Sequence, residues 1–449
     1  MAANADNSRK ARRAIAAAVQ LPSTSDAEFE SSLSELRQLA KTLGFEVVRT
    51  FTQKRAGFDS AGYFGVGKRA ELKALVESEA ADAILVDHEI SPSQSHTLQK
   101  EAGAEVMDRT MVILEIFHRH ARSRAARAQV EIARLGYMAP RMREASKLAG
   151  PKDRGRSGTG GRSGGESFGE LDSRKIRDRI AELKRELEGM SAGRETQRAR
   201  RLERQGLARV ALVGYTNAGK STLMRALTGS EVLVANKLFA TLDTTVRELH
   251  PASVPKILVS DTVGFIKNLP HGLVASFKST LDEALEASLL AHVVDASDPG
   301  FERQLAVTEQ VLAEIGAKEI PRLLIFNKID QAGDAPAQKA LAASLRGRHP
   351  DCVVMSARSK DDVARLHARI VAFFQRNLVE AELFLPWSAQ KRRGEIFATC
   401  QVLGEHAEAE GAVLRVRGEA ATVQRLEKQF PSRSGDKRAA SGTRRSPRR

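Results

Sequence analysis

One glycine-rich string has the residue types and the spacing that bind phosphate groups. Residues 209 to 222 read RVALVGYTNAGKST, an apolar run followed by the pattern G-x-x-x-x-G-K-S. Glycines let backbone N–H groups turn onto phosphate oxygens, the lysine reaches the outer phosphates, and the hydroxyl holds Mg²⁺. The pattern predicts a nucleoside triphosphate site built from Gly214, Tyr215, Thr216, Asn217, Ala218, Gly219, Lys220 and Ser221.

A second string, Asp261-Thr262-Val263-Gly264, follows another apolar run. Asp261 suits a carboxylate that approaches Mg²⁺ directly or through water, and the amide of Gly264 suits a sensor of the γ-phosphate. Phe265 comes next, where Ras-like enzymes carry the glutamine that positions the attacking water. A phenyl ring cannot orient water, so we expect slow intrinsic hydrolysis that a partner surface or another group accelerates.

The string Asn327-Lys328-Ile329-Asp330 predicts which base is bound. The carboxylate of Asp330 can accept two parallel hydrogen bonds from the N1–H and the exocyclic amine of guanine, whereas adenine offers no such pair of donors. The string therefore favours GTP over ATP. Asn327 can bridge the base and the phosphate loop, and a later segment, Ser356-Ala357-Arg358, is placed to close over the base.

A threonine-rich segment lies between the phosphate loop and Asp261. It begins Phe239-Ala240-Thr241-Leu242-Asp243 and continues with two further threonines, Thr244 and Thr245. Such a segment can supply a second hydroxyl ligand to Mg²⁺ when GTP orders it. The residue types alone do not say which threonine does so.

The strings follow apolar runs in a way that predicts the fold of residues 206–376. Strand-like runs recur at Lys256–Ser260, Leu290–Val294, Arg322–Phe326 and Cys352–Met355, separated by helical spacing. This alternation predicts an α/β fold with a doubly wound, mostly parallel sheet, in which sites lie at the carboxyl ends of the strands.

The remaining segments predict smaller units around this domain. We expect a disordered N-terminus over residues 1–13, a small α/β domain over 14–110, a basic helical hairpin over 111–205 with a glycine-rich loop at 150–169, a small α+β unit over 377–430 and a disordered basic tail over 431–449. The loop is either a plain linker or a segment that grips RNA. Glycines 62, 65 and 67 form either a tight turn or a second nucleotide loop.

Composition limits the partners and the compartment. The 449 residues carry a formal charge of +15, concentrated in residues 141–209 and in the tail, which points to nucleic acid or, less strongly, to an anionic membrane surface. The sequence has no apolar run of about eighteen residues and no secretory signal, so we expect a cytoplasmic protein. Its two cysteines, Cys352 and Cys400, argue against disulfides and zinc.

The strings GYTNAGKST, FATLD, DTVGFI, NKID and SAR resemble those of the HflX family of ribosome-associated GTPases. The resemblance continues through GYFGVGK and DRTMVILEIFHRHARSRAARAQVEIARLGYMAPR, and it covers about residues 15 to 376. It implies that Thr241 and Ser221 are the Mg²⁺ ligands, with Lys220, Thr241 and Gly264 acting in hydrolysis. Asn217 resembles the asparagine through which some relatives bind K⁺, and a loop-stabilising role is the alternative. The glycine-rich linker and the arginine-rich tail depart from the family pattern.

The resemblance implies a monomeric GTPase that binds the large ribosomal subunit through ribosomal RNA and splits or recycles ribosomes under stress. Two other functions remain open. One is an ATP-dependent RNA remodeller, although the sequence contains no second phosphate loop. The other is a GTP switch for a non-ribosomal protein or for peripheral association with membranes.

Overall fold

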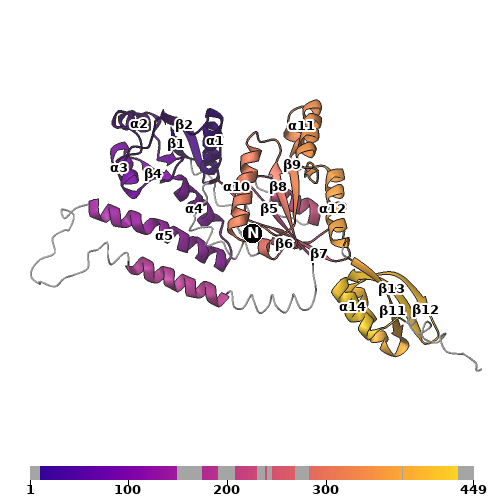
Figure 1. Cartoon of the computed structure of the whole chain (residues 1–449). Helices are drawn as coiled ribbons and strands as arrows, with labels where there is room; N and C mark the ends of the chain where they lie inside the picture. The colour runs from indigo at the N-terminus through magenta and orange to yellow at the C-terminus, as the bar shows by residue number, and fades with distance from the viewer. Residues whose placement is uncertain are drawn as a thin grey trace, which may run out of the picture.

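The computed structural model describes residues 11–148, 174–190, 208–229, 238–239, 245–267, 283–376 and 378–432. These residues form an N-terminal α/β domain, a pair of long helices, a second α/β domain and a small C-terminal unit (Figure 1). The two α/β domains lie side by side and share a hydrophobic core.

The N-terminal domain is a parallel sheet of order β2-β1-β3-β4 with helices against it. Ser25 begins the first helix by accepting a hydrogen bond from the Glu28 N–H, and Gly44, at φ 82°, follows its last turn. The first strand begins at Arg12, so two residues that we assigned to the disordered N-terminus belong to the sheet. The elements are β1 (Arg12–Gln20), α1 (Asp26–Thr42), β2 (Phe45–Lys54), α2 (Val66–Glu79), β3 (Ala83–Val86), α3 (Pro92–Ala102), β4 (Glu105–Asp108) and α4 (Arg109–His120).

The glycine cluster at residues 62–67 forms a tight turn that packs around an arginine. Tyr63 has a φ of 66° and exchanges backbone hydrogen bonds with Asp59, whose carboxylate accepts the Gly62 N–H. A Cβ on Gly62 would lie 2.6 Å from the guanidinium of Arg69, which donates to the carbonyl of Phe64. These contacts account for Gly62 by the need for a turn, whereas Gly67 lies in the first turn of α2 with open space around it.

The first half of the helical hairpin that we predicted over residues 111–205 is two helices with different partners. The first, α4, packs into the N-terminal core through Val112, Ile113 and Phe117, so it belongs to the N-terminal domain. The backbone is extended at Ala121, the Ser123 hydroxyl accepts the Ala126 N–H, and α5 (Arg124–Leu148) begins. The interruption separates the N-terminal core from the long helix, and the 3.6-residue spacing did not reveal it.

Helix 174–190 runs antiparallel to α5 (Figure 1). An ion pair joins Arg124, at the start of α5, to Glu186, near the end of the second helix. Apart from residues 174–190, the segment from 149 to 207, which contains the glycine-rich loop, lies outside the described residues.

The second α/β domain has a six-stranded sheet of order β10-β9-β8-β5-β7-β6. All neighbouring strands are parallel except β6, which pairs antiparallel with β7 and which the sequence did not predict. Its elements are β5 (Ala208–Gly214), α7 (Lys220–Thr228), β6 (Thr245–Glu248), β7 (Ile257–Asp261), β8 (Leu289–Asp295), α10 (Phe301–Glu314), β9 (Arg322–Asn327), η2 (Ile329–Gln331), α11 (Ala335–Arg348), β10 (Val353–Val354) and α12 (Lys360–Gln375).

The C-terminal unit is an antiparallel sheet of order β11-β13-β12 with α14 packed on it. Its core joins strand residues such as Leu383 and Leu414 to Leu426 of the helix. The elements are β11 (Leu378–Pro386), η3 (Trp387–Arg392), α13 (Arg393–Thr399), β12 (Gln401–Ala407), β13 (Gly411–Glu419) and α14 (Ala420–Gln429).

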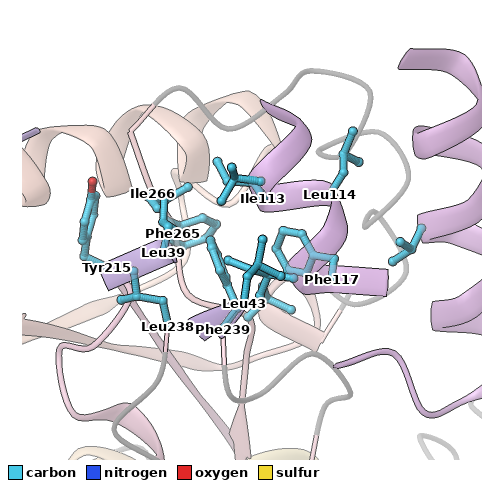
Figure 2. Close-up of a cluster of buried hydrophobic side chains, with 14 of the residues drawn as sticks. Leu39, Leu43, Ile113, Leu114, Phe117, Tyr215, Leu238, Phe239, Phe265 and Ile266 are labelled. Carbon is cyan, nitrogen blue, oxygen red and sulfur yellow. The ribbon is translucent and has the colours of Figure 1, made fainter. Parts of the chain in front are cut away.

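The two α/β domains meet at a cluster of aromatic and aliphatic side chains (Figure 2). The rings of Phe117 and Phe239 lie 4.5 Å apart between centroids, and Phe265 lies in the same cluster. The hydroxyl of Thr42 accepts the N–H of Leu238 at 3.3 Å. The N-terminal domain therefore contacts two segments that flank the predicted phosphate site.

Candidate nucleotide site

The phosphate loop joins the carboxyl end of β5 to the N-terminus of α7, and two of its glycines are sterically required. Gly214 has a φ of 146°, and a Cβ there would lie 2.1 Å from the carbonyl oxygen of Val293 on β8. Gly219 has a φ of 95°, and its Cβ would lie 2.3 Å from Nδ2 of Asn327. Any other residue would force the loop away from the sheet and from the base-reading segment.

Lys220 is buried at the first turn of α7 and donates to two carbonyls of its own loop. Its Nζ lies 3.0 Å from the Gly214 oxygen and 2.8 Å from the Tyr215 oxygen. Burial lowers the pKa of Lys220 to about 8, against the opposing effect of the Asp261 carboxylate. This buried cation is held where a phosphate would compensate its lost hydration.

The donor set that Mg²⁺ needs is present beside Lys220. The Ser221 hydroxyl donates to Oδ2 of Asp261 at 2.7 Å, and Asp261 is fully buried at the end of β7. Hydroxyl and carboxylate oxygens are ligands that Mg²⁺ prefers, so these residues fit the ion. Ala240, Thr241, Leu242 and Asp243, including the predicted second hydroxyl ligand, lie outside the described residues.

The segment after β7 is tied to the phosphate loop by its backbone. The N–H of Phe265 donates to the Gly214 oxygen at 3.1 Å, and the Phe265 oxygen accepts the N–H of Thr216 at 2.7 Å. A Cβ on Gly264 would lie 2.9 Å from both Nζ of Lys220 and Cα of Thr216, so only glycine fits there. Thr262 is anchored to β5, where its hydroxyl donates to the Leu212 oxygen at 2.7 Å.

Phe265 and Phe239 face the N-terminal domain. Phe265 is 2% exposed and packs in the cluster with Ile266 and Leu39 of α1 (Figure 2). Phe239, which we predicted to line the nucleotide site, packs instead against Phe117. The structure thus gives Phe265 a packing role and places no water-orienting side chain at its position.

Asn327 connects the base-reading segment to the phosphate loop. At the end of β9, its Nδ2 donates to the Ala218 oxygen and its Oδ1 accepts the Ala357 N–H, both at 2.9 Å. Asp330 lies in η2, half-exposed, with Arg358 Nη1 3.8 Å from its Oδ2. The predicted segments at 214–221, 261–264, 327–330 and 356–358 therefore meet at one edge of the sheet.

One residue of this edge was absent from the sequence prediction. Asp295 ends β8 and accepts a hydrogen bond from Lys328 Nζ at 2.7 Å, which fixes the lysine beside the loop. A carboxylate directly after the buried run LLAHVV was the signal that could have revealed it. Thr216, which the sequence placed in the phosphate loop, has a buried hydroxyl with no hydrogen-bond partner among the described residues. Asn217 is exposed at φ 60°, a conformation that asparagine tolerates.

Other kinds of site receive no support from the described residues. Within them, no helix is long and apolar enough to cross a membrane, and no three acidic, histidine or cysteine side chains gather as a metal-binding group. Cys352 and Cys400 are free thiols.

The glycine-rich loop between β5 and α7, the buried carboxylate at the end of β7 and the Asn-Lys-Ile-Asp string at the end of β9 define a P-loop GTPase. Family models agree along the chain. "GTP-binding GTPase N-terminal" matches residues 30–118, "GTP-binding GTPase Middle Region" matches 120–201, and "50S ribosome-binding GTPase" matches 209–328.

Curated relatives match over almost the whole length. GTPase HflX of Gluconacetobacter diazotrophicus is 48% identical, covering 94% of this chain and 98% of its own length. GTPase HflX of Escherichia coli is 36% identical, over 91% and 94%. A solved GTP-binding protein of Sulfolobus solfataricus in complex with GDP matches at 25% identity and a TM-score of 0.43, covering 79% of this chain and 99% of that chain.

The chain belongs to the HflX family of GTPases. The family and the fold class that the sequence predicted are confirmed, as is the prediction that the chain is a GTP-hydrolysing enzyme.

Proposed function

We propose that this GTPase is a ribosome-bound switch that binds the large ribosomal subunit and hydrolyses GTP to GDP and phosphate there. The observation that carries the proposal is the position of Asn327, which bonds to both the phosphate loop and the 356–358 segment. Asn327 thereby links binding of the base to binding of the phosphates. The match of residues 209–328 to the 50S ribosome-binding GTPase model supports the choice of partner.

Each residue of the site takes a role in this proposal. Lys220 and the amide of Gly264 stabilise the γ-phosphate, while Asn327 and Asp330 read guanine with Ser356, Ala357 and Arg358 over the base. Ser221 and Thr241 would hold Mg²⁺ together with Asp261. The ion would neutralise negative charge on the phosphate oxygens. Asn217 is a candidate K⁺ ligand.

Hydrolysis needs help from outside the chain in this proposal. Phe265 is packed against the N-terminal domain, so its side chain cannot orient the attacking water. An ordered contact on the ribosome would hold the residues around Gly264 and Thr241 in the reactive arrangement. GTP hydrolysis would then be coupled to subunit binding, and the slow intrinsic rate would keep GTP intact until the ribosome is reached.

The basic helices are the proposed contact with ribosomal RNA. We place α5 and helix 174–190, with the loop 150–169, against the RNA, and we assign the chain to the cytoplasm as a monomer. The proposed consequence of GTP-dependent binding is the splitting or recycling of ribosomes under stress. The domain division is proposed with it: an N-terminal domain that runs from Arg12 through α4, a GTPase domain over residues 206–376, a C-terminal unit over 377–430 and the tail at 431–449.

The test is GTP hydrolysis by the purified chain with and without ribosomes. We expect ribosomes to raise the rate sharply, the Lys220→Ala variant to lose activity, and shortening of residues 150–169 to weaken ribosome binding. Sedimentation of intact ribosomes with the protein and GTP tests splitting. Activity that ignores ribosomes but rises with anionic vesicles would favour a membrane switch instead. ATP hydrolysis that survives Lys220→Ala would favour an RNA remodeller.

A further inference from the structure

The side chain of Tyr215, the second residue of the phosphate loop, contacts the N-terminal domain. Tyr215 is 7% exposed, and its ring lies beside Ile266 at the margin of the shared cluster, with the hydroxyl pointing out of it (Figure 2). That hydroxyl accepts the backbone N–H of Lys267 at 2.8 Å. One side chain of the loop therefore holds the main chain three residues beyond Gly264.

A buried ionic network fixes the other side of the Tyr215 hydroxyl. Glu35 of α1 places its negative charge beside Tyr215 and forms an ion pair with Arg109, the first residue of α4. Arg109 is almost fully buried and donates to Oδ1 of Asp87 at 2.8 Å, while Ser32 donates to the other oxygen of Asp87 at 2.6 Å. Burial and the Glu35 charge both raise the pKa of Tyr215, so the phenol stays protonated and can donate.

The other contact of Lys267 is weaker. Its ammonium lies 3.8 Å from Glu28, and both side chains are partly exposed, so this pair contributes little to position. The backbone of Phe265 is already bonded to Gly214 and Thr216. The hydrogen bond to the Tyr215 hydroxyl is thus a third attachment of the segment 264–267 to the phosphate loop. Of the three attachments, this one is made by a side chain that contacts the N-terminal domain.

We propose that Tyr215 is a positioning residue for GTP hydrolysis. Its hydroxyl holds the backbone of Lys267, and with it Gly264, against the phosphate loop. The Glu35–Arg109–Asp87 network in turn keeps the hydroxyl in place. The inference rests on the proposed hydrolysis at this site. Gly264 must meet the γ-phosphate in the transition state, and small displacements of such groups reduce rates strongly. Guanine recognition depends on Asn327 and Asp330, so it does not involve this attachment.

The experiment compares full-length Tyr215→Phe with the unaltered protein in steady-state GTP hydrolysis, with and without ribosomes. Loss of one hydrogen bond predicts a decrease in kcat of about fivefold. KM for GTP and the affinity for GDP should stay within about twofold, because the guanine contacts and the loop amides are intact. A conservative change, Glu35→Gln, keeps an acceptor for the phenol and should retain a larger share of kcat than Tyr215→Phe.

Tyr137→Phe is the matched control. Tyr137 is also a partly buried phenol that donates to a carboxylate, Asp108, but it lies on α5 and makes no contact with the loop among the described hydrogen bonds. Its replacement should leave the kcat measured without ribosomes unchanged. An equal decrease in both variants would show a general stability effect and overturn the inference, as would an unchanged kcat in Tyr215→Phe. Absence of GTP hydrolysis by the unaltered protein, with ribosomes present, would instead overturn the proposed function.

Discussion

Lys220 shows how burial of one cation shapes nucleotide binding. Its folded-state pKa of about 8 is below the ordinary value of 10.5, because burial disfavours the charged form. Anionic phosphates favour that form, so the protonated lysine binds nucleotide more tightly. As pH rises through about 8, the free protein loses this proton, and affinity for GDP should decrease by about tenfold between about pH 7 and about pH 9.

Isothermal titration calorimetry with GDP across this range measures the effect. Lys220→Ala should bind weakly and without this pH dependence, whereas Lys339→Ala, on the exposed side of α11, should keep it. If the unaltered protein binds GDP equally well from neutral to alkaline pH, Lys220 stays charged throughout and the burial argument is wrong.

Asp330 is the residue on which base selection depends in our proposal. Asp330→Asn replaces an acceptor of two charge-assisted hydrogen bonds with a group that donates on one side. Affinity for GDP should decrease by at least about 100-fold, since each such bond contributes about 1.5 to 3 kcal/mol. Affinity for xanthosine diphosphate should rise, because xanthine carries a carbonyl where guanine has the amine.

Asp334→Asn is the control for this substitution. Asp334 begins α11 by accepting the Ala337 N–H at 3.0 Å, a role that asparagine fills equally well. Fluorescence binding with both nucleotides should show no change in that variant. Equal affinity of Asp330→Asn for GDP would place the base elsewhere.

At the scale of elements, the sequence predicted strands that carry continuous apolar runs and helices with clear ends. The run before Gly214 and the one before Asn327 became β5 and β9, with the predicted residues at their carboxyl ends. Local patterns failed where the determining contacts are distant. β6 is half-exposed and is held by pairing with β7, and the break at Ala121 depends on how α4 packs.

The side-chain directions at the site were the part that no motif could supply. Phe239 and Tyr215 lie within strings typical of nucleotide binding, yet both side chains contact the N-terminal domain. That contact joins residues about 120 and 180 positions apart in the chain, and spacing within a motif carries no information about it.

The packing of α4 against Phe239 gives a prediction at this scale. A bound GDP stabilises every part of the protein that unfolds cooperatively with the nucleotide site. Because the Phe117–Phe239 contact lies in the shared core, GDP should raise the thermal stability of both α/β domains in the unaltered protein. Phe239→Ala removes a buried ring worth about 3 kcal/mol and should leave the N-terminal domain unresponsive to GDP.

Hydrogen exchange of β1 and β3 measures this response. Phe51→Ala is the control: it disrupts the Phe51–Phe64 contact inside the N-terminal domain, at 5.3 Å between ring centroids, without touching the shared core. That variant should exchange faster overall but remain protected further by GDP. If GDP slows hydrogen exchange in the N-terminal domain of Phe239→Ala as much as in the unaltered protein, other contacts couple the two domains.

At the scale of the whole molecule, the net charge and the two-domain core act together. The shared core joins the phosphate site to the N-terminal domain, from which α5 and helix 174–190 extend (Figure 1). A rigid connection of this kind lets contacts on the helices bear on the segment around Gly264. The proposed ribosomal contact and the proposed activation of hydrolysis are then two aspects of one binding event.

The charge on helix 174–190 gives the prediction that belongs to this scale. Lys184 and Arg185 are exposed on it, and binding of such residues to RNA phosphates releases counterions. The double variant Lys184→Glu with Arg185→Glu should bind large ribosomal subunits more weakly. It should also reduce the slope of log affinity against log salt concentration, by about one for each RNA phosphate that a replaced side chain had neutralised. The same net change on α11, Lys339→Glu with Arg346→Glu, should leave the slope intact. Helix α11 belongs to the second α/β domain and lies away from α5 and helix 174–190 (Figure 1). Filter binding over a series of KCl concentrations distinguishes these outcomes. Equal decreases in affinity for both pairs would mean that total charge, rather than this helix, governs binding.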